Sequence, residues 1–386
     1  MAHRPAEARG KGAALLGLSA VEQRDRLASG AIRAVELVEA CLARIAEVEP
    51  QVRAWAWLDG DHALAQARTL DARRQAGHPL GPLHGLPVAL KDVIDTKSIP
   101  TQNGTPIDEG RVPAEDAWIV ARLRAAGAVI LGKTITTECA FLHPGPTRNP
   151  WNGAHTPGGS SQGSAAAVAA GMVPLAIGTQ TGGSVIRPAA FCGVVGVKPS
   201  FGLIPRTGVL MQSPTLDTLG VFARGVEDAA LLIEVLAGHD ALDVATIPRP
   251  APRLLATASA RPPVVPMFAR VRLPGEDGLH PDMAAAMDEL TDALGEQCFE
   301  VPLPGLFAEA EAQRRRINFA EMSKCYYGLE RRGRAQMSAP LTAAIDEGKA
   351  VPVRDYLAAL DWRALMNAAL GEVFDRCDAI LCPAAL

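Results

Sequence analysis

Two Gly-Gly-Ser tripeptides, Gly158–Ser160 and Gly182–Ser184, stand at either end of one apolar stretch that is rich in small residues. A serine hydroxyl becomes a nucleophile when a base removes its proton and backbone N–H groups stabilise the oxyanion that forms. The two glycines before Ser184 allow consecutive N–H groups to point toward one place, as an oxyanion hole requires. The second tripeptide is therefore the candidate nucleophile turn.

A serine nucleophile needs a base, and the sequence offers two kinds. His84 and His155 lie near these segments, but neither has an evident carboxylate partner. Lys91 ends the apolar run "LPVAL", and a lysine accepts a proton when burial lowers its pKa. A lysine at the end of a strand is also commonly a solvated edge residue, so the residue types alone leave the base open.

Phosphate-binding uses of glycine explain this stretch less well. Gly127–Thr134, "GAVILGKT", matches the P-loop pattern, but its four middle residues form a good strand where a P-loop needs a tight loop. The dinucleotide pattern G-x-G-x-x-G is absent from residues 156–200. A flexible linker would be polar rather than apolar. Nucleotide binding and a linker are both disfavoured.

The elements that position these residues alternate between helix and strand. Residues 19–76 predict helices, and Ser19 with Glu22 predicts a capping box at the start of one of them. Short apolar runs at Pro87–Leu90 and Ala128–Leu131 predict buried strands, and "SAAAVAA" predicts a small-residue helix. This alternation favours an α/β fold with a parallel or mixed sheet.

Composition limits the class of protein. The 386 residues carry a net charge of −4, which does not favour nucleic-acid binding, and the Arg-rich run Gln313–Phe319 predicts a solvated helix face. The seven cysteines contain no C-x-x-C pair, as in a reducing compartment. Ala165–Ile177 is too short to span a bilayer, and the first residues lack a secretory signal. We expect a cytoplasmic protein.

Three segments together resemble the amidase signature family: "GLPVALKDVIDT", "PGGSSQGSAAAVAAGMVPLAIGTQTGGSVIRPAAFCGVVGVKPSFGLIP" and "LDTLGVFARGVEDAA". The resemblance runs from about residue 14 to 386 and is densest in 81–230. It implies the α/β amidase signature fold, with a central mixed β-sheet flanked by helices on both faces. The expected organisation is one domain over 1–386, with N-terminal helices in 14–78, a catalytic core in 79–240 and a helical, pocket-forming part in 241–386.

The resemblance also implies a Ser–cis-Ser–Lys triad. Ser184 would be the nucleophile, Ser160 the bridging serine behind a non-proline cis peptide bond, and Lys91 the base. The implied activity is hydrolysis of a linear amide C–N bond of a small substrate through an acyl-enzyme, with no metal and no organic cofactor. The oxyanion amides would belong to Thr181, Gly182, Gly183 and Ser184.

The sequence departs from the family pattern at three places. Gln162 replaces a glycine after the first tripeptide, Gln180 replaces an aspartate, and Arg187 follows the nucleophile by three residues instead of two. "GTQTGGSVIRPAA" resembles the malonamidase-like branch, in which this arginine holds a substrate carboxylate. Arg187 could equally brace the nucleophile loop. The implied substrate-binding residues are Arg187, Gln180, Gly158 and Gly159.

The end of the chain and the partners leave alternatives. Asp378–Leu386 resembles a strand that opens further elements in the family, so the last part of the fold is expected to be missing.

The alternatives to a small-amide amidase are a non-catalytic or partner-dependent amidase-fold subunit, and a hydrolase of carbamates or urea derivatives. An amidotransferase subunit acting on charged tRNA is disfavoured by the lack of a basic excess. We expect a small-molecule amide, no nucleic acid and no membrane, and we allow for a homodimer.

Overall fold

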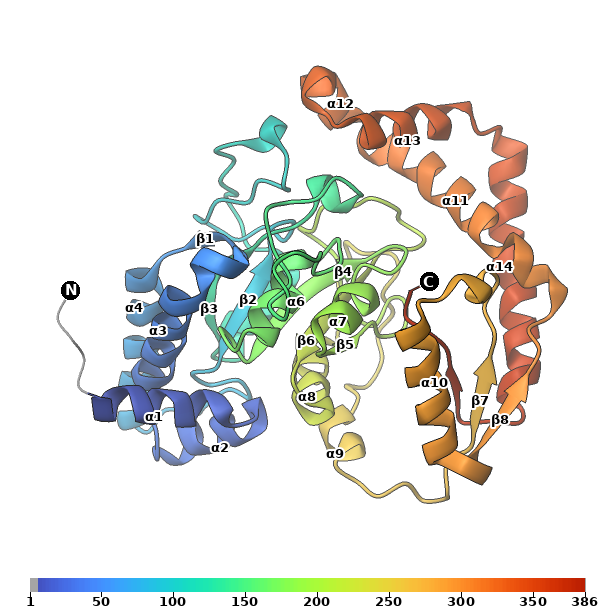
Figure 1. Cartoon of the computed structure of the whole chain (residues 1–386). Helices are drawn as coiled ribbons and strands as arrows, with labels where there is room; N and C mark the ends of the chain where they lie inside the picture. Colours follow the sequence, from blue (N-terminus) through green and yellow to red (C-terminus); the bar gives the residue numbers. More distant parts are fainter. Residues whose placement is uncertain (1–5, 386) are drawn as a thin grey trace. The chain divides into compact units, whose positions relative to one another are not determined.

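The computed structural model describes residues 6–385, which divide into two compact units (Figure 1). The first unit comprises Met1–Ser259 together with Tyr326–Thr342, and the second comprises Ala260–Cys325 together with Ala343–Leu386. The assignment of 1–386 to one amidase domain, and the expectation that its last part is missing, stay predictions.

A six-stranded mixed sheet forms the centre of the first unit. The strand order is β1-β3-β2-β4-β6-β5. The three central strands β3, β2 and β4 are parallel, whereas β1 is antiparallel to β3, and β6 is antiparallel to both β4 and β5. The mixed sheet is therefore confirmed. The strands are β1 (Trp55–Leu58), β2 (Pro87–Lys91), β3 (Val129–Thr134), β4 (Leu175–Gln180), β5 (Val195–Val197) and β6 (Thr218–Ala223).

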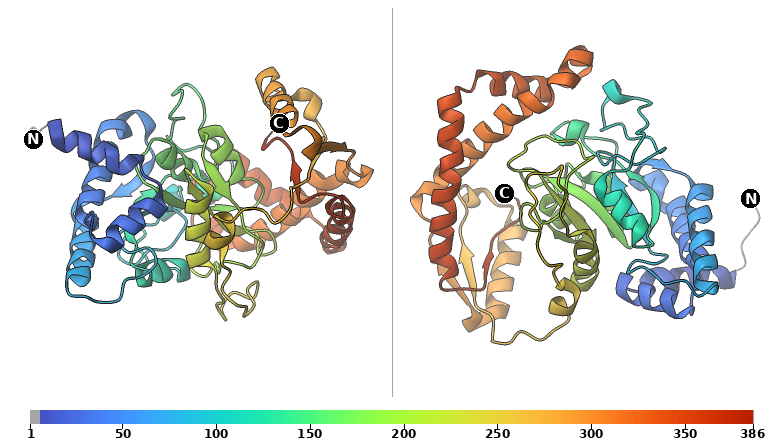
Figure 2. Two further views of the ribbon diagram at one scale, coloured as in Figure 1. Left: turned by 90° about the horizontal axis from the view of Figure 1, so that it is seen from below. Right: turned by 180° about the vertical axis from the view of Figure 1, so that it is seen from behind.

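Helices cover both faces of this sheet. Helix α6 (Gln162–Ala169) lies in front of it in Figure 1, and α5 (Trp118–Ala125) lies in front when the view is turned by 180° (Figure 2). Strands β2 and β3 are buried along their whole length, as parallel strands between two helical layers must be. The P-loop-like segment is thus the buried strand β3, as its apolar residues predict.

The small residues of α6 allow it to pack closely against the backbone. A Cβ added to Gly163 would lie 2.2 Å from the carbonyl oxygen of Ala54 and 2.6 Å from the amide nitrogen of Ile135. These neighbours are main-chain atoms and cannot rotate away. The predicted small-residue helix is confirmed. Because its residues are small, the helix can lie this close to the neighbouring backbone.

The N-terminal helices follow the prediction with one exception. The Ser19 hydroxyl accepts a hydrogen bond from the backbone N–H of Glu22, and the Glu22 carboxylate accepts one from the backbone N–H of Ser19, which completes the predicted capping box. Trp55–Leu58, inside the segment expected to be helical, is instead the edge strand β1. The remaining helices of this unit are α1 (Ala6–Gly17), α2 (Ala20–Ser29), α3 (Ala34–Val52), α4 (Gly60–Gln75), α7 (Ile186–Cys192), α8 (Val226–Leu236), α9 (Leu254–Ala258) and α12 (Tyr327–Gly333).

The second unit contains a three-stranded sheet, of which the sequence predicted only the last strand, within Asp378–Leu386. Strands β7 (Phe268–Val271), β8 (Cys298–Val301) and β9 (Ala379–Leu381) are parallel, in the order β8-β7-β9. The description of 241–386 as helical was therefore incomplete. Strands of three or four residues carry no usable periodicity, so pairing partners decide their structure. The other helices are α10 (Pro281–Leu294), α11 (Ala310–Cys325), α13 (Ala339–Ala350) and α14 (Val353–Phe374).

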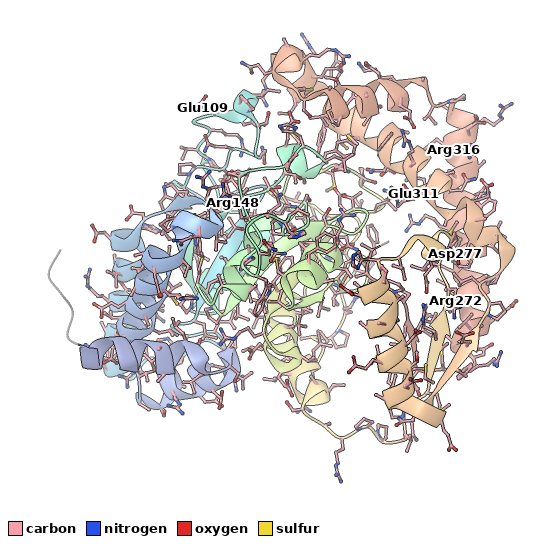
Figure 3. The ribbon with its side chains drawn as sticks, in the orientation of Figure 1. Glu109, Arg148, Arg272, Asp277, Glu311 and Arg316 are labelled. Carbon is pink, nitrogen blue, oxygen red and sulfur yellow. The ribbon has the colours of Figure 1, made fainter. Side chains whose placement is uncertain are left out.

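The Arg-rich run is a solvated helix face, as predicted. It lies on α11, where Arg314 pairs with Glu311 at 2.5 Å and Arg315 pairs with Glu347 at 2.6 Å. Arg316 is exposed on the same helix (Figure 3). Within residues 6–385, no helix combines the length and the hydrophobicity needed to cross a bilayer.

Candidate active site

Lys91 is the last residue of β2, and its side chain is completely buried. Its Nζ donates hydrogen bonds to Ser160 Oγ at 2.7 Å and to Thr179 Oγ1 at 2.8 Å. Strand β4, which carries Thr179, lies directly beside β2 in parallel register. Because the carboxyl ends of parallel neighbours meet at one edge of the sheet, this edge collects polar groups from both strands.

Burial gives Lys91 the protonation behaviour of a base. Removal of the ammonium from water lowers the pKa of Lys91 to about 7, and the charge of Asp217 acts against that shift. An unperturbed lysine would stay protonated until far above neutral pH. At neutral pH, a substantial fraction of Lys91 is therefore uncharged and able to accept a proton from the hydroxyl it contacts.

His84 and His155 do not compete for this role. His84 precedes β2 and so lies at the opposite end of that strand from Lys91, where its backbone N–H bonds to Gly81. His155 is exposed in the loop before the first Gly-Gly-Ser tripeptide. The structure thus favours Lys91 over either histidine as the base beside Ser160.

The first Gly-Gly-Ser tripeptide forms a tightly anchored turn. The Gly159–Ser160 peptide bond is cis, as the resemblance implies. The Ser160 side chain is buried, and its carbonyl oxygen accepts a hydrogen bond from the N–H of Thr137. The next residue, Ser161, uses its hydroxyl to bond both the N–H and the carbonyl of Thr179, each at 3.3 Å. The turn is therefore fixed to β4, which also leads to the second tripeptide.

The second tripeptide connects the end of β4 to α7. Gly183 has a φ of +125°, which a residue with a side chain rarely adopts. The Gln180 side-chain oxygen accepts hydrogen bonds from the N–H groups of Val185 at 2.8 Å and Ile186 at 3.0 Å. Gln180, expected to bind substrate, thus uses this oxygen to hold the start of α7. Ser184 is 8% exposed at the centre of the turn.

Arg187 joins the two tripeptides. Its Nε and Nη2 donate to the carbonyl oxygen of Gly159 at 3.1 Å and 2.9 Å, and the N–H of Ser161 donates to the carbonyl of Ser184 at 3.4 Å. Gly158 lies against the same helix, because a Cβ there would approach Pro188 Cα to 2.8 Å. The bracing function of Arg187 is visible in these contacts, whereas its recognition of a carboxylate, and substrate contacts by Gly158 and Gly159, stay predictions.

Two residues at this edge of the sheet were not predicted as site residues from the sequence. Thr179 is the second acceptor for Lys91, and Asp217 accepts a hydrogen bond from Thr181 Oγ1 at 2.5 Å. The sequence did contain one indication of this cluster: Thr179 and Thr181 are two residues apart, a spacing that places both side chains on one face of an extended segment. Asp217 belongs to the quoted segment "LDTLGVFARGVEDAA", but the pairing of β6 with β4 that brings it to Thr181 is not readable from one sequence.

A cavity opens beside the second tripeptide within the first unit. Tyr326 closes part of this region: its side chain is fully buried, and its hydroxyl donates to the carbonyl of Cys139 at 2.6 Å. Cys139 and Ala140 both have positive φ angles, which non-glycine residues adopt chiefly at constrained sites. The cavity is lined by Ala140, Thr179, Thr181, Arg206, Val209, Leu210, Met211, Gln212, Asp217, Thr218 and Leu219.

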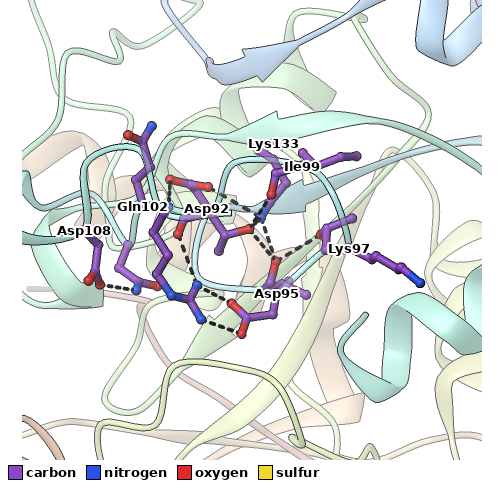
Figure 4. Close-up of polar contacts among 12 residues, drawn as sticks. Asp92, Asp95, Lys97, Ile99, Gln102, Asp108 and Lys133 are labelled. Carbon is purple, nitrogen blue, oxygen red and sulfur yellow. Dashed lines mark hydrogen bonds and ion pairs between the residues drawn. The ribbon is translucent and has the colours of Figure 1, made fainter. Parts of the chain in front are cut away.

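A second buried lysine lies on the neighbouring strand but faces a different set of groups (Figure 4). Lys133 Nζ donates to the carbonyl of Ile94 at 2.6 Å and to Thr101 Oγ1 at 2.5 Å, and it lies 3.5 Å from Asp92 Oδ1. Burial lowers the pKa of Lys133 to about 8. These contacts fasten the segment after Lys91 to β3, so Lys133 supports the site without entering it.

Comparison with known proteins identifies relatives over most of the chain. A family model described as Amidase matches residues 36–386. The A subunit of glutamyl-tRNA(Gln) amidotransferase from Thermobifida fusca (strain YX) is 47% identical over 309 residues, which are 77% of this chain and 62% of that protein. The same subunit from Acidothermus cellulolyticus is 49% identical over 250 residues, 63% of this chain and 50% of that protein. The chain thus spans between half and two thirds of these curated relatives.

These relatives are amidotransferase A subunits rather than malonamidases, so the expected malonamidase-like branch is not supported. Solved structures agree on the fold. A chain from a vestigial protein complex linked to the origins of an s-triazine catabolic enzyme superposes with a TM-score of 0.86 at 31% identity, covering 95% of this chain and 81% of its own. A bacterial aryl acylamidase of the amidase signature family gives 0.82 at 27% identity, covering 94% and 79%. Since the family model matches nearly the whole sequence, this chain belongs to the amidase signature family.

Proposed function

We propose that this chain is an amidohydrolase that cleaves an amide C–N bond through an acyl-enzyme on Ser184. The observation that carries the proposal is the 2.7 Å hydrogen bond between Lys91 Nζ and Ser160 Oγ in a fully buried setting. A pKa of about 7 lets this lysine exchange a proton at neutral pH, and an active-site base needs that property.

The proposed reaction moves one proton through the two serines. Neutral Lys91 takes the proton of Ser160 Oγ while Ser160 takes the proton of Ser184 Oγ, and Ser184 attacks the carbonyl carbon. The oxygen, now negative, is stabilised by the backbone N–H groups of residues 181–184. As the tetrahedral intermediate collapses, the C–N bond breaks and the departing nitrogen receives the proton from the lysine through Ser160. Water then attacks the ester by the same route, releasing the acid and free Ser184.

Small primary amides are the proposed substrate class. The Arg187 guanidinium donates two hydrogen bonds to the Gly159 carbonyl, and this use of its N–H groups disfavours a role in binding the carboxylate of a substrate. The cavity beside the turn is small, with a volume of about 10 Å³, and its lining combines five apolar residues with six polar or charged ones. Its one lining cation, Arg206, forms a bidentate pair with Asp243. Aryl amides, carbamates and urea derivatives are the alternatives that a substrate panel separates.

A second candidate function is that of an amidase unit within an amidotransferase. The observation that favours it is the 47% identity to a glutamyl-tRNA(Gln) amidotransferase A subunit. In that case the amide nitrogen released by the chain would serve a partner, and hydrolysis by the isolated chain would be slow. The chain lacks a basic excess, which disfavours contact with charged tRNA, but an amidase unit does not itself need to bind nucleic acid.

The experiment is covalent labelling followed by a substrate panel. A serine-directed sulfonyl fluoride is expected to modify Ser184 in the folded protein, and Lys91→Ala is expected to abolish the modification. Ammonia release is then measured with benzamide, butyramide, glutamine and a monoamide of a short dicarboxylic acid. Absence of labelling in a folded sample would overturn the proposal and favour a non-catalytic scaffold. Labelling at Ser184 with release from glutamine alone would favour the amidotransferase unit.

A further inference from the structure

Asp217 lies directly across the sheet from the candidate nucleophile turn. It precedes β6, whose first residue, Thr218, pairs with Gln180 at the end of β4. The residue after Gln180 is Thr181, the first of the turn, so the antiparallel register places Asp217 beside it. The result is the 2.5 Å hydrogen bond from Thr181 Oγ1 to Asp217 Oδ1, which crosses between the two strands.

The Asp217 carboxylate is buried and held on both oxygens. Only 8% of the residue is exposed, and it lines the cavity together with Thr179 and Thr181. While Oδ1 accepts from Thr181, Oδ2 accepts from the backbone N–H groups of Gln212 at 2.7 Å and Ser213 at 2.9 Å. Three donors on one carboxylate favour its charged form. The Asp217 side chain therefore has one defined orientation.

Arg206 holds the backbone of the same segment. Its Nη1 donates to the carbonyl oxygens of Pro214 at 2.8 Å and Asp217 at 3.0 Å, while Nε and Nη2 are bound to Asp243. The Arg206–Asp243 pair is 5% exposed on both sides. The Arg206 guanidinium forms its ion pair with Asp243 rather than with Asp217. Arg206 therefore anchors the backbone of the loop without neutralising the Asp217 carboxylate by direct contact.

Asp217 also acts on the base. Its charge raises the pKa of Lys91 against the lowering effect of burial. The charged groups that face Asp217 are Lys91 from β2 and Arg206 from the preceding loop, and the polar groups are the Thr181 hydroxyl and the two backbone N–H groups. Burial raises the pKa of Asp217 itself, and its hydrogen bonds and Arg206 oppose that rise. One carboxylate thus touches the nucleophile turn and biases the lysine.

We propose that Asp217 is a positioning residue of this active site: it fixes the 181–184 turn through Thr181, and its buried charge, in the cavity that Thr179 also lines, acts on the lysine that Thr179 contacts. This inference rests on the proposed function, because it assigns Asp217 a role in activating Ser184. It accounts for a buried acid that the Ser–Ser–Lys mechanism does not use. It also explains why a threonine, whose hydroxyl has no part in the proton transfer, begins the turn.

The test measures the rate at which a sulfonyl fluoride labels Ser184 in the full chain between pH 6 and 8.5. This readout needs no knowledge of the substrate. Asp217→Asn keeps the shape of the side chain and removes its charge. We expect labelling at pH 8.5 to slow about tenfold because the turn loses a fixed anchor. We expect the ratio of the pH 6 rate to the pH 8.5 rate to rise about threefold, because Lys91 loses protons more easily without the carboxylate.

Matched variants separate position from charge. Thr181→Val removes the anchoring hydroxyl and leaves the carboxylate, so labelling should slow with the pH ratio unchanged, whereas Thr181→Ser keeps the hydroxyl and should recover most of the lost rate. Asp95→Asn removes a carboxylate that pairs with Arg111 elsewhere and should leave the pH ratio unchanged. If Asp217→Asn does not fold, the comparison of Thr181→Val with Thr181→Ser still tests the inference.

Three results would overturn the inference or the function beneath it. A folded Asp217→Asn variant with the wild-type pH ratio would overturn the inference, and so would Thr181→Val with the wild-type rate. Wild-type protein that folds but is not labelled at Ser184 would instead overturn the proposed function. The two failures are therefore distinguishable in one series of measurements.

Discussion

Arg187 donates two hydrogen bonds to the carbonyl oxygen of Gly159, and that carbonyl belongs to the cis peptide unit that precedes Ser160. One side chain from the start of α7 therefore holds the turn of Ser160 against the turn of Ser184. A guanidinium can place two N–H groups on one acceptor in a fixed plane, which an ammonium cannot do. The distance between the two serines depends on this contact.

The first prediction concerns Arg187. Arg187→Ala should lower kcat/KM by about tenfold to a hundredfold, because small displacements of reacting groups cost that much. The loss should be equal for neutral and carboxylate-bearing amides, and Arg187→Lys should restore little of it. The measurement is ammonia release from butyramide and from a dicarboxylic monoamide. A loss confined to the carboxylate-bearing substrate would show that Arg187 binds the substrate.

The second prediction concerns the pH dependence of activity. Lys91 must be neutral to accept a proton, and its pKa is about 7, so kcat/KM should fall as the pH drops below about 7. The measurement is a pH–rate profile between pH 5 and 9. His84→Asn is the control, because this buried imidazole lies at the far end of β2 and should not move the acidic limb. If His84→Asn shifted the acidic limb of the pH–rate profile, the base would be His84 and not Lys91.

The third prediction is that Lys91 lowers the stability of the fold. Its folded pKa of about 7 lies below its ordinary value of 10.5, so the unfolded chain binds more protons between these pH values. The free energy of unfolding therefore rises with pH across that window, and the full penalty applies below pH 7. Lys91→Met should raise the free energy of unfolding by on the order of a few kcal/mol at pH 6.

Urea unfolding of Lys91→Met and wild type at pH 6 and pH 9 measures this difference. The stabilisation should be largest at pH 6 and smaller at pH 9, because part of the penalty has by then disappeared from the wild type. A stabilisation of equal size at both values would mean that packing, and not the charge of the lysine, is responsible.

The fourth prediction gives the opposite sign for the other buried lysine. Lys133→Met should lower the free energy of unfolding by about 3 kcal/mol, because Asp92 is left buried without its partner. Adding Asp92→Asn to Lys133→Met should recover part of that loss. Urea unfolding at neutral pH measures both variants. If Lys133→Met were as stable as wild type, the contacts of Lys133 in Figure 4 would contribute little to the fold.

The sequence predicted the parts of the fold that have strong local signals. The capping box at Ser19, the buried strand ending at Lys91 and the small-residue helix α6 follow from spacing and residue type, and the structure has all three. Lys91 and Ser160 came together as the resemblance implies. Local signals suffice here because each of these features is decided within a few residues of the chain.

The parts that were missed depend on partners distant in the sequence. Strand β1 has four residues inside a helical segment, and its pairing with β3 decides its structure. The contact of Thr181 with Asp217 requires β6 to pair with β4, and the strands of the second unit likewise depend on one another. The sequence left Arg187 open between binding a substrate carboxylate and bracing the nucleophile loop, because its acceptor, a backbone carbonyl, leaves no trace in residue types.

The base and the nucleophile turn extend from adjacent parallel strands that have no exposed face. Lys91 ends β2, which pairs with β4, so a displacement of its backbone would disturb the core of the first unit. The assembled site therefore has the same cooperativity as the sheet: heat or denaturant should remove activity and the central strands in one transition. A loss of activity that leaves the central strands intact would have to come from the two turns that Arg187 and Asp217 hold, around Ser160 and Ser184.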